Sequence, residues 1–400
     1  MKVENRAKVA ATGLILGGMT LLFGCSSNYN QPPPKKLPPN PHAVKIKRVW
    51  SHNVGGGGGR QLLGLAAGVE IGQGGPEVFA ASTHGHVAAF DAATGKRLWS
   101  HHVKKGRLSG GPVAGDGLVV VGTRLGDAIA LDASDGKLKW KQYVGAPVIA
   151  APAIGTSIVA VKTIAGTLVG LSPKTGAVVW QTSEAQPSLT LRFGIEPLIV
   201  NGVVYGGFAD GNVIAVDAAT GKEQWHRQVG QPSGNNPVAN LVNVGGVMDF
   251  VGGDLYVATY QSRLAALDGN SGQVLWSRKL STYTGVGLDG AHVYVSDAAG
   301  AVHAYDLVTG VPDWTDSALG YRRLSIPVPF GKLVAVGDRF GWLHFLDRDN
   351  GHYLGRVKVG GGAIRMPPVV AGDYLIVLDD DGTLAAYTLP ASNAKPEPKP

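Results

Sequence analysis

The chain has 400 residues, of which only 16% are charged, and it is rich in glycine (59) and proline (24). This composition is typical of many short strands joined by tight turns rather than of helices, and an all-β chain of this length often forms one domain. The formal net charge is +7, but Lys and Arg do not gather in one segment as they do in proteins that bind nucleic acids, so we expect no nucleic-acid partner.

The first 24 residues have the features of an export signal. Residues 2–8 are basic, and residues 9–23 form an apolar run that is too short and too rich in glycine for a transmembrane helix. The end of this run, Leu22-Phe23-Gly24-Cys25, resembles the lipobox of bacterial lipoproteins, whose cysteine is acylated. Cys25 is the only cysteine, so it cannot form a disulfide within the chain. We expect Cys25 to carry the lipid; a cleaved signal followed by an incidental cysteine is the alternative.

The residues after Cys25 differ in composition from the rest of the chain. Ser26 follows the cysteine, which by resemblance to enterobacterial sorting signals indicates the outer membrane. Residues 25–41 are rich in Ser, Asn, Pro and Lys, and we expect an extended tether there. Residues 390–400 repeat this composition, and we expect them to be disordered. The folded domain is therefore expected over residues 42–389.

One motif, A-x-D-x-x-T-G-K-x-x-W, recurs along that domain. A period near 40 residues indicates one supersecondary unit repeated around or along an axis. The last copy, at residues 346–351, has Gly355 where the others have tryptophan. The complete copies end at Trp99, Trp140, Trp180, Trp225, Trp276 and Trp314.

Each period is long enough for four short antiparallel strands, which together form the blade of a β-propeller. Glycine at the end of each turn allows left-handed backbone, and the Asp side chain can accept hydrogen bonds from turn amides. In one repeat we expect strands at residues 118–121, 127–131 and 137–140, turns at 122–126 and 132–136, and the innermost strand of the next unit at 146–151.

The number of blades follows from the two ends of the domain. A third-strand pattern, glycine or serine followed by alternating apolar residues, occurs eight times, and the last copy spans residues 382–388. Only seven outer strands follow these copies, whereas residues 44–50 have strand alternation and a tryptophan, Trp50, with no blade before them. We therefore predict that the strand of Trp50 pairs with residues 383–387 and closes an eight-bladed ring. Each tryptophan is expected to pack on the neighbouring blade and to donate its N–H to a backbone oxygen.

The motif resembles the PQQ-like repeat, also called the tryptophan-docking motif, over residues 44–389. This resemblance implies one of two functions: a quinoprotein dehydrogenase, or a lipoprotein of the BamB family, which belongs to the outer-membrane β-barrel assembly (BAM) machinery. A dehydrogenase needs PQQ, calcium with carboxylate ligands and a catalytic base, and several have an adjacent cysteine pair. The candidate residues here lack a matching arrangement, so we expect no catalytic, metal or cofactor site: Asp379-Asp380-Asp381 and His84-Gly85-His86 fall in turns, and His101-His102 have no carboxylates at suitable spacing.

The BamB resemblance implies a partner-binding site on two loops. Residues 187–192 resemble the exposed BamB loop that contacts the POTRA domains of BamA, with Leu189 and Leu191 as apolar anchors and Arg192 as a charged contact. In an ordinary blade, these residues would instead form an inner strand whose alternate side chains enter the core. A second loop, with acidic partner-binding residues in BamB, matches residues 240–246, where Asn243 and Gly245 replace the carboxylates.

The resemblance thus implies a non-catalytic scaffold of the BAM complex, anchored by lipid at the periplasmic face of the outer membrane. Its expected partners are the BamA POTRA domains and other BAM subunits, with nascent outer-membrane proteins as a further candidate. It would assist insertion of β-barrel proteins into the membrane. A periplasmic PQQ-dependent dehydrogenase and a surface propeller that binds polysaccharide are the alternatives.

Overall fold

Within the described residues, every regular element is a β-strand, and no helix there is long and apolar enough to cross a membrane. The candidate residues Cys25 and Arg192 and the tail 390–400 lie outside the described residues. The computed structural model describes residues 32–54, 65–68, 75–104, 107–191 and 194–389.

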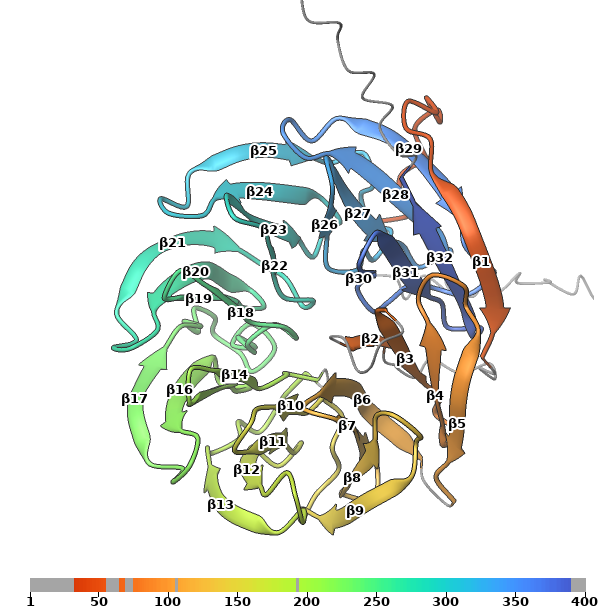
Figure 1. The fold of residues 1–400 in the computed structure, drawn as a ribbon. Helices are drawn as coiled ribbons and strands as arrows, with labels where there is room; N and C mark the ends of the chain where they lie inside the picture. The colour runs from red at the N-terminus through yellow and green to blue at the C-terminus, as the bar shows by residue number, and fades with distance from the viewer. Residues whose placement is uncertain (1–31, 55–64, 69–74, 105–106, 192–193, 390–400) are drawn as a thin grey trace, which may run out of the picture. The chain divides into compact units, whose positions relative to one another are not determined.

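The compact unit of residues 34–400 contains eight four-stranded antiparallel sheets, formed from its described residues and arranged as the blades of a ring (Figure 1). In seven blades the strands follow one another in chain order, with the first near the centre of the ring and the fourth at its rim. The predicted all-β, eight-bladed propeller is therefore confirmed.

The strand bounds follow the repeat. Blade 1 contains β2 (Leu65–Gly68), β3 (Glu77–Ala81), β4 (His86–Asp91) and β5 (Arg97–His102). Blade 2 contains β6 (Leu108–Gly115), β7 (Leu118–Thr123), β8 (Asp127–Asp132) and β9 (Leu138–Tyr143). Blade 3 contains β10 (Ala153–Ile154), β11 (Val159–Lys162), β12 (Thr167–Leu171) and β13 (Val178–Ser183). Blade 4 contains β14 (Leu198–Val200), β15 (Val203–Gly207), β16 (Asn212–Asp217) and β17 (Glu223–Gln228).

The second half of the ring has the same plan. Blade 5 contains β18 (Asp249–Val251), β19 (Asp254–Ala258), β20 (Ser262–Asp268) and β21 (Val274–Leu280). Blade 6 contains β22 (Gly287–Leu288), β23 (His292–Ser296), β24 (Val302–Asp306) and β25 (Pro312–Asp316). Blade 7 contains β26 (Val328–Phe330), β27 (Leu333–Gly337), β28 (Trp342–Asp347) and β29 (Tyr353–Lys358). Blade 8 contains β30 (Val369–Ala371), β31 (Tyr374–Leu378), β32 (Thr383–Thr388) and, as its outer strand, β1 (Lys47–Asn53).

Blade 8 joins the two ends of the domain. Strand β1 pairs antiparallel with β32, with Trp50 opposite Ala386 and Asn53 opposite Thr383. The predicted closure is confirmed, although the strand begins at Lys47 rather than Val44. Strand β1 thus occupies the edge of β32 that would otherwise be unpaired and could recruit another chain.

The inner strand of blade 3 differs from our expectation. Residues 146–151 are not a strand, and β10 contains only Ala153 and Ile154. Pro147 and Pro152 lack the N–H that a ladder requires, which explains why pairing starts only after Pro152. The other strands expected in this region, at 118–121, 127–131 and 137–140, correspond to β7, β8 and β9.

The turns between second and third strands share one face of the ring with the connections between blades. Equivalent strands of successive blades run in the same direction, so the end of every outer strand lies at that face. We call it the connector face. It includes the connections 184–197, 229–248 and 317–327 and the turns 123–126 and 338–341.

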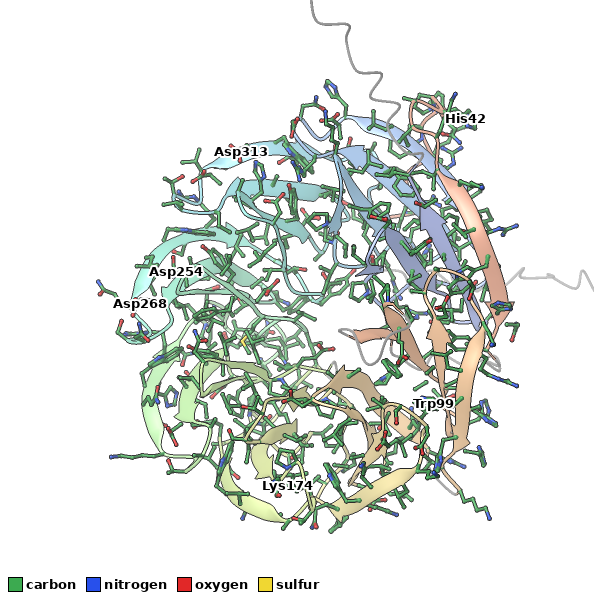
Figure 2. The ribbon with its side chains drawn as sticks, in the orientation of Figure 1. His42, Trp99, Lys174, Asp254, Asp268 and Asp313 are labelled. Atoms are coloured by element: carbon green, nitrogen blue, oxygen red, sulfur yellow. The ribbon has the colours of Figure 1, made fainter. Side chains whose placement is uncertain are left out.

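The hydrophobic core is divided among the spaces between blades, where apolar side chains of neighbouring sheets pack together. In seven of these spaces formed by the described chain, a tryptophan of one blade donates its Nε1–H to a backbone oxygen of the next at 2.7–3.1 Å. Trp99 of β5, for example, bonds to the Ala133 oxygen of blade 2 (Figure 2). The predicted docking role is confirmed for Trp50, Trp99, Trp140, Trp180, Trp225, Trp276 and Trp314.

The turn of the next motif is shaped to receive that tryptophan. In blade 5, Asp268 Oδ1 accepts hydrogen bonds from the Ser271 amide (2.7 Å) and hydroxyl (2.6 Å), which fixes the turn (Figure 2). Gly272 has φ +67°, and a Cβ added there would lie 2.6 Å from Trp225 Cε3. Glycine is required at this position both for its backbone conformation and for the space that Trp225 occupies.

The space between blades 7 and 8 lacks a tryptophan, because Gly355 stands at that position. The partner of Gly355 on β28 is the buried Phe345, whereas the equivalent partner of Trp314 on β24 is Ala304. A second element also fills this space: residues 34–46, which we call the strap, lie along β29 and pack Val44 and Ile46 against the cluster between the two blades.

Backbone and side-chain hydrogen bonds hold the strap along the outer edge of blade 7. Ala43 N donates to Leu354 O (3.1 Å), Arg356 Nη1 to Pro38 O (2.8 Å), and Asn40 Nδ2 to Arg356 O (3.3 Å). Most of the strap belongs to the stretch 25–41 that composition predicts to be a tether. The strap therefore covers the free edge of β29 rather than leaving it to solvent.

Candidate partner-binding site

The first predicted loop is the connection between β13 and β14, residues 184–197. Leu189 and Leu191 precede β14, which begins only at Leu198, so neither residue belongs to an inner strand. The Leu189 side chain is 41% exposed, and Leu191 is partly buried. The structure therefore places Leu189 at the connector face in the manner of an apolar contact residue.

Asn243, in the connection 229–248, lies against this loop. Its Nδ2 donates to the backbone oxygen of Leu191 at 3.2 Å, and its own backbone oxygen accepts from Tyr260 N at 2.8 Å. Its side chain is fully buried, and within the described residues its Oδ1 has no hydrogen-bond partner. Asn243 thus brings the two predicted loops together and fixes the position of Leu191 instead of being exposed to solvent.

A further bond joins the two loops closer to the ring axis. Glu196 N donates to Gly246 O at 2.8 Å, which ties the start of blade 4 to the start of blade 5. Burial raises the pKa of the Glu196 carboxyl to about 7. The inner part of the site therefore joins the two loops through their backbones, while its outer part carries the exposed Leu189.

Sequence reasoning missed Val238, an apolar side chain in the second loop. It is 60% exposed and lies in a stretch that otherwise contains mainly Ser, Asn, Gly and Pro. An apolar residue in such a polar stretch was the signal that could have revealed it. Leu189 and Val238 together give each of the two neighbouring loops one exposed apolar side chain.

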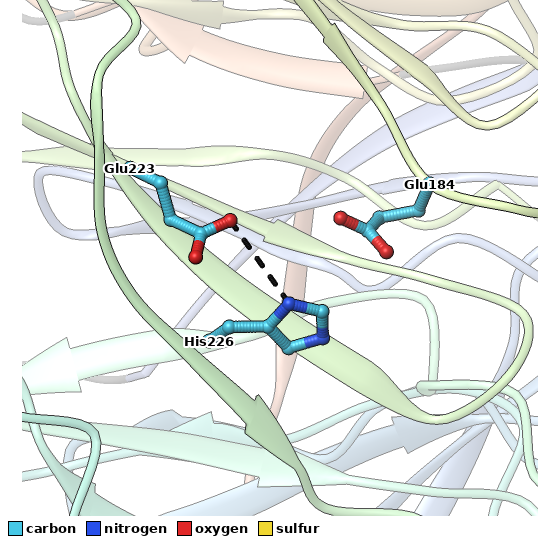
Figure 3. Close-up of side chains that lie close together, drawn as sticks. All are labelled: Glu184, Glu223 and His226. Carbon is cyan, nitrogen blue, oxygen red and sulfur yellow. Dashed lines mark ion pairs between the residues drawn. The ribbon is translucent and has the colours of Figure 1, made fainter.

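A cluster of two carboxylates and a histidine lies at the start of the first loop (Figure 3). Glu184 is the first residue of that loop, directly after β13, and Glu223 and His226 belong to β17. One ligand atom from each lies within 4.8 Å of the others, and His226 Nδ1 is 4.0 Å from Glu223 Oε2. Burial raises the pKa of Glu184. Glu223 and His226 are both exposed, and such surface groups often lie together without an ion, so we assign no metal to this cluster.

Among the other candidate residues, His84 lies in the turn between β3 and β4, as predicted. His86 instead begins β4, and its ring lies 4.4 Å from that of His102 at the end of β5. Asp379 follows β31, and its Oδ1 accepts from the amides of Asp381 (3.1 Å) and Thr383 (2.8 Å). The carboxylate of Asp379 therefore stabilises a hairpin turn, as expected.

Comparison with known proteins defines the family. Residues 83–316 match the family model described as "Outer membrane protein assembly factor BamB". The protein of that name from Pseudomonas aeruginosa is 38% identical over 369 residues, which cover 92% of this chain and 96% of the relative. The chain belongs to the BamB family.

Solved structures agree with this assignment. The crystal structure of BamB from Moraxella catarrhalis has a TM-score of 0.77 and 28% identity, covering 86% of this chain and all of that one. Quinohemoprotein alcohol dehydrogenase from Comamonas testosteroni also has a similar structure, with a TM-score of 0.65, and the match covers 88% of this chain and 78% of the dehydrogenase. Its identity is only 15%, so this second likeness concerns the propeller fold alone.

Proposed function

We propose that this protein is a non-catalytic scaffold of the BAM complex that binds the POTRA domains of BamA and assists the insertion of β-barrel proteins into the outer membrane. Membership of the BamB family supports this role. The observation that carries the binding site is the exposed Leu189 on a loop that Asn243 holds in place. A rigid ring with an apolar contact residue suits a protein that positions another domain.

The roles of the site residues follow from their environments. Leu189 would insert into an apolar depression of the POTRA domain, and Arg192, three residues along, would add a charged contact at its rim. Leu191 is partly buried, so it supports the loop and presents only part of its side chain. Asn243 is a positioning residue, because its amide bonds to the backbone of Leu191 and its side chain is not exposed.

We also propose that the protein acts at the periplasmic face of the outer membrane, attached by lipid on Cys25. The lipobox-like sequence supports the modification, and family membership supports the location. Other BAM subunits are further partners in this proposal. Nascent outer-membrane proteins are candidate partners that could pair with exposed strand edges at the rim of the blades.

The binding site is tested by the affinity of the protein for purified BamA POTRA domains. Leu189→Ala is expected to weaken binding about tenfold or more, as truncation of an apolar anchor usually does. Leu191→Ala and Arg192→Ala test the remaining contacts. Leu125→Ala is the matched control, because Leu125 is also an exposed leucine (62%) in a turn at the connector face.

The positioning role of Asn243 has a separate test. Asn243→Ala removes the bond to Leu191 and should weaken POTRA binding less than Leu189→Ala does. Amide hydrogen exchange in residues 185–191 should become faster at the same time, since the loop loses its support. Full POTRA affinity in Leu189→Ala would contradict the proposed site, and unchanged exchange in Asn243→Ala would contradict the positioning role alone.

A further inference from the structure

A group of basic side chains surrounds an exposed aromatic ring at the connector face, between blades 6 and 7. We call Arg323, Arg339, Phe340 and Lys358 the basic patch. Phe340, in the turn between β27 and β28, is 38% exposed, and the guanidinium of Arg339 lies 4.7 Å from its ring centre. Lys358, at the end of β29, donates to the Phe340 backbone oxygen. Its Nζ also lies 5.3 Å from the ring centre of Trp342.

The positive charge of the basic patch is not balanced locally. Asp338 is the nearest carboxylate in the turn, but it is fully buried. It already accepts from Arg322 Nε (2.6 Å) and pairs with His344 Nε2 (3.1 Å), beneath the exposed surface. Among the described residues, no carboxylate forms an ion pair with Arg323, Arg339 or Lys358. These three cations are therefore available to an anionic partner.

The strap begins beside the basic patch. Lys35 N donates to Gly320 O (2.9 Å) and Lys35 Nζ to Ser317 O (2.9 Å), both in the connection that also contains Arg323. Arg322 Nη1 donates to Lys35 O at 3.4 Å. The start of the strap is thus fixed to the same corner of the connector face that carries the unpaired cations.

The length of chain before the strap limits how far this corner can be from a lipid on Cys25. Pro34 is nine positions after Cys25 in the sequence. A fully extended chain spans at most 3.3–3.6 Å per residue, so the corner would lie within about 30 Å of the lipid attachment. A lipid on Cys25 would therefore keep this corner of the propeller within reach of the membrane surface.

We propose that the basic patch binds the anionic phospholipid headgroups of the membrane into which the lipid of Cys25 is inserted. This inference rests on the lipid attachment in the proposed function. Cations near an anionic leaflet are attracted to it, and aromatic rings are favoured at the interface. Stable attachment to a membrane often combines a lipid chain with a basic cluster. The patch would thus add a second point of attachment and present the connector face at a defined angle.

The test uses residues 26–400, expressed without the export signal and Cys25, so that neither an acyl chain nor the apolar run 9–23 contributes to binding. The probe is sedimentation with vesicles of equal parts phosphatidylglycerol and phosphatidylcholine, compared with vesicles of phosphatidylcholine alone. We expect binding to the anionic vesicles only, and weakening by added salt. Changing Arg323, Arg339 and Lys358 to Gln together should reduce that binding about 100-fold, or about fivefold for each charge.

The matched control changes Lys137, Lys139 and Lys141 to Gln. It removes the same amount of charge from blade 2, where each lysine already pairs with an aspartate. Arg322 is left intact because of its bond to the buried Asp338. Circular dichroism and POTRA affinity, which should both be unchanged, report on folding and on the partner site.

Two results would overturn the proposal. Wild-type binding by the triple Gln variant of the patch, or equal binding to neutral vesicles, would exclude headgroup recognition by these residues. A loss of POTRA affinity with no loss of vesicle binding would make the patch part of a protein interface. Because the probe protein has no lipid, its result does not depend on whether Cys25 is acylated, which mass spectrometry of the native protein determines.

Discussion

Seven spaces between described blades are closed by tryptophan, and the eighth, between blades 7 and 8, is closed by the strap. A docked tryptophan needs one side chain and one hydrogen bond, as in Trp225 to Gly269 O (2.9 Å). The eighth space uses the larger Phe345 opposite Gly355, with Val44 and Ile46 of the strap packed beside it. A repeat can thus lose its main packing residue when a segment outside the repeat replaces it.

The two solutions differ in their cost and in their location. Docking a tryptophan costs little conformational entropy, because its side chain has few rotamers. Closing the eighth space with the strap costs more, because the backbone of 13 residues must become ordered. The strap also reaches its site from outside the propeller. We therefore expect the space between blades 7 and 8 to open more readily than the others, and the following experiments test that difference.

The largest effect is expected from removing a docked tryptophan. Trp225→Ala leaves a cavity between blades 4 and 5 and should lower the free energy of unfolding by about 3–5 kcal/mol. Urea denaturation measures this change. Trp225→Phe should cost less, because Gly269 O still accepts a hydrogen bond from Tyr205 at 3.1 Å. If both variants were as stable as wild type, tryptophan docking would not stabilise the ring.

A smaller loss is expected at the strap. Val44→Ser with Ile46→Ser removes the apolar contacts of two partly buried side chains and should cost about 2 kcal/mol. Amide exchange should then accelerate in β29 before it does so in other outer strands. The control, Lys36→Ser with Lys45→Ser, changes exposed strap residues and should stay within about 0.5 kcal/mol of wild type. Uniform acceleration over all blades would contradict a local role.

A pair of glycines separates backbone strain from the need to accommodate tryptophan. Gly272 (φ +67°) and Gly252 (φ +64°) both have left-handed backbone in blade 5, but only Gly272 faces a tryptophan, and nothing lies within 4 Å of a Cβ at Gly252. Gly252→Ala should cost about 1 kcal/mol through strain alone. Gly272→Ala should cost about 1 kcal/mol more, because Trp225 must shift. Thermal or urea unfolding of the two variants decides this, and equal losses would mean that docking tolerates an added methyl group.

The last prediction concerns the pH dependence of stability at Glu196, in the connection that leads to β14. The pKa of Glu196 is raised from 4.5 to about 7 by burial, so the folded protein binds this proton more tightly than the unfolded chain does. Ionising the buried carboxyl therefore lowers the free energy of unfolding. This loss of stability is absent below pH 4.5, grows as the pH rises, and is complete above pH 7. Glu196→Gln should therefore stabilise the protein by about 1–2 kcal/mol at pH 8 and have little effect at pH 4.5. A stabilisation that did not change with pH would exclude titration of Glu196 as its cause.

Sequence alone predicts the ring because every repeat carries the same turn and tryptophan positions. The turn glycines, the tryptophan spacing and the unmatched strand of Trp50 depend on local chemistry, and together they give eight blades and their closure. The short β10 was mispredicted because hydrophobicity outweighed Pro147 and Pro152 in our interpretation. A proline at both positions is a stronger signal than hydrophobicity, because neither residue can donate to a strand ladder.

The strap and the internal support of the binding site could not be predicted in this way. Residues 34–46 have no repeating pattern, and their contacts are with residues near 320 and 355. The bond from Asn243 to Leu191 spans 52 residues, and nothing in either loop sequence indicates that the amide is buried. Such features depend on how the closed ring brings distant segments together, which composition and periodicity do not describe.

Closure by β1 and β32 has a consequence for how the protein is made. Strand β1 is near the start of the chain and its partner is near the end, so the ring cannot close until almost the whole chain has been synthesised and exported. During that interval β1 has a free edge that carries Val49 and Trp50. Lys47 and Arg48 on the same strand discourage its pairing with other chains. A chain cut before β32 would leave both β1 and β31 without the strand that joins them, so blade 8 could not form.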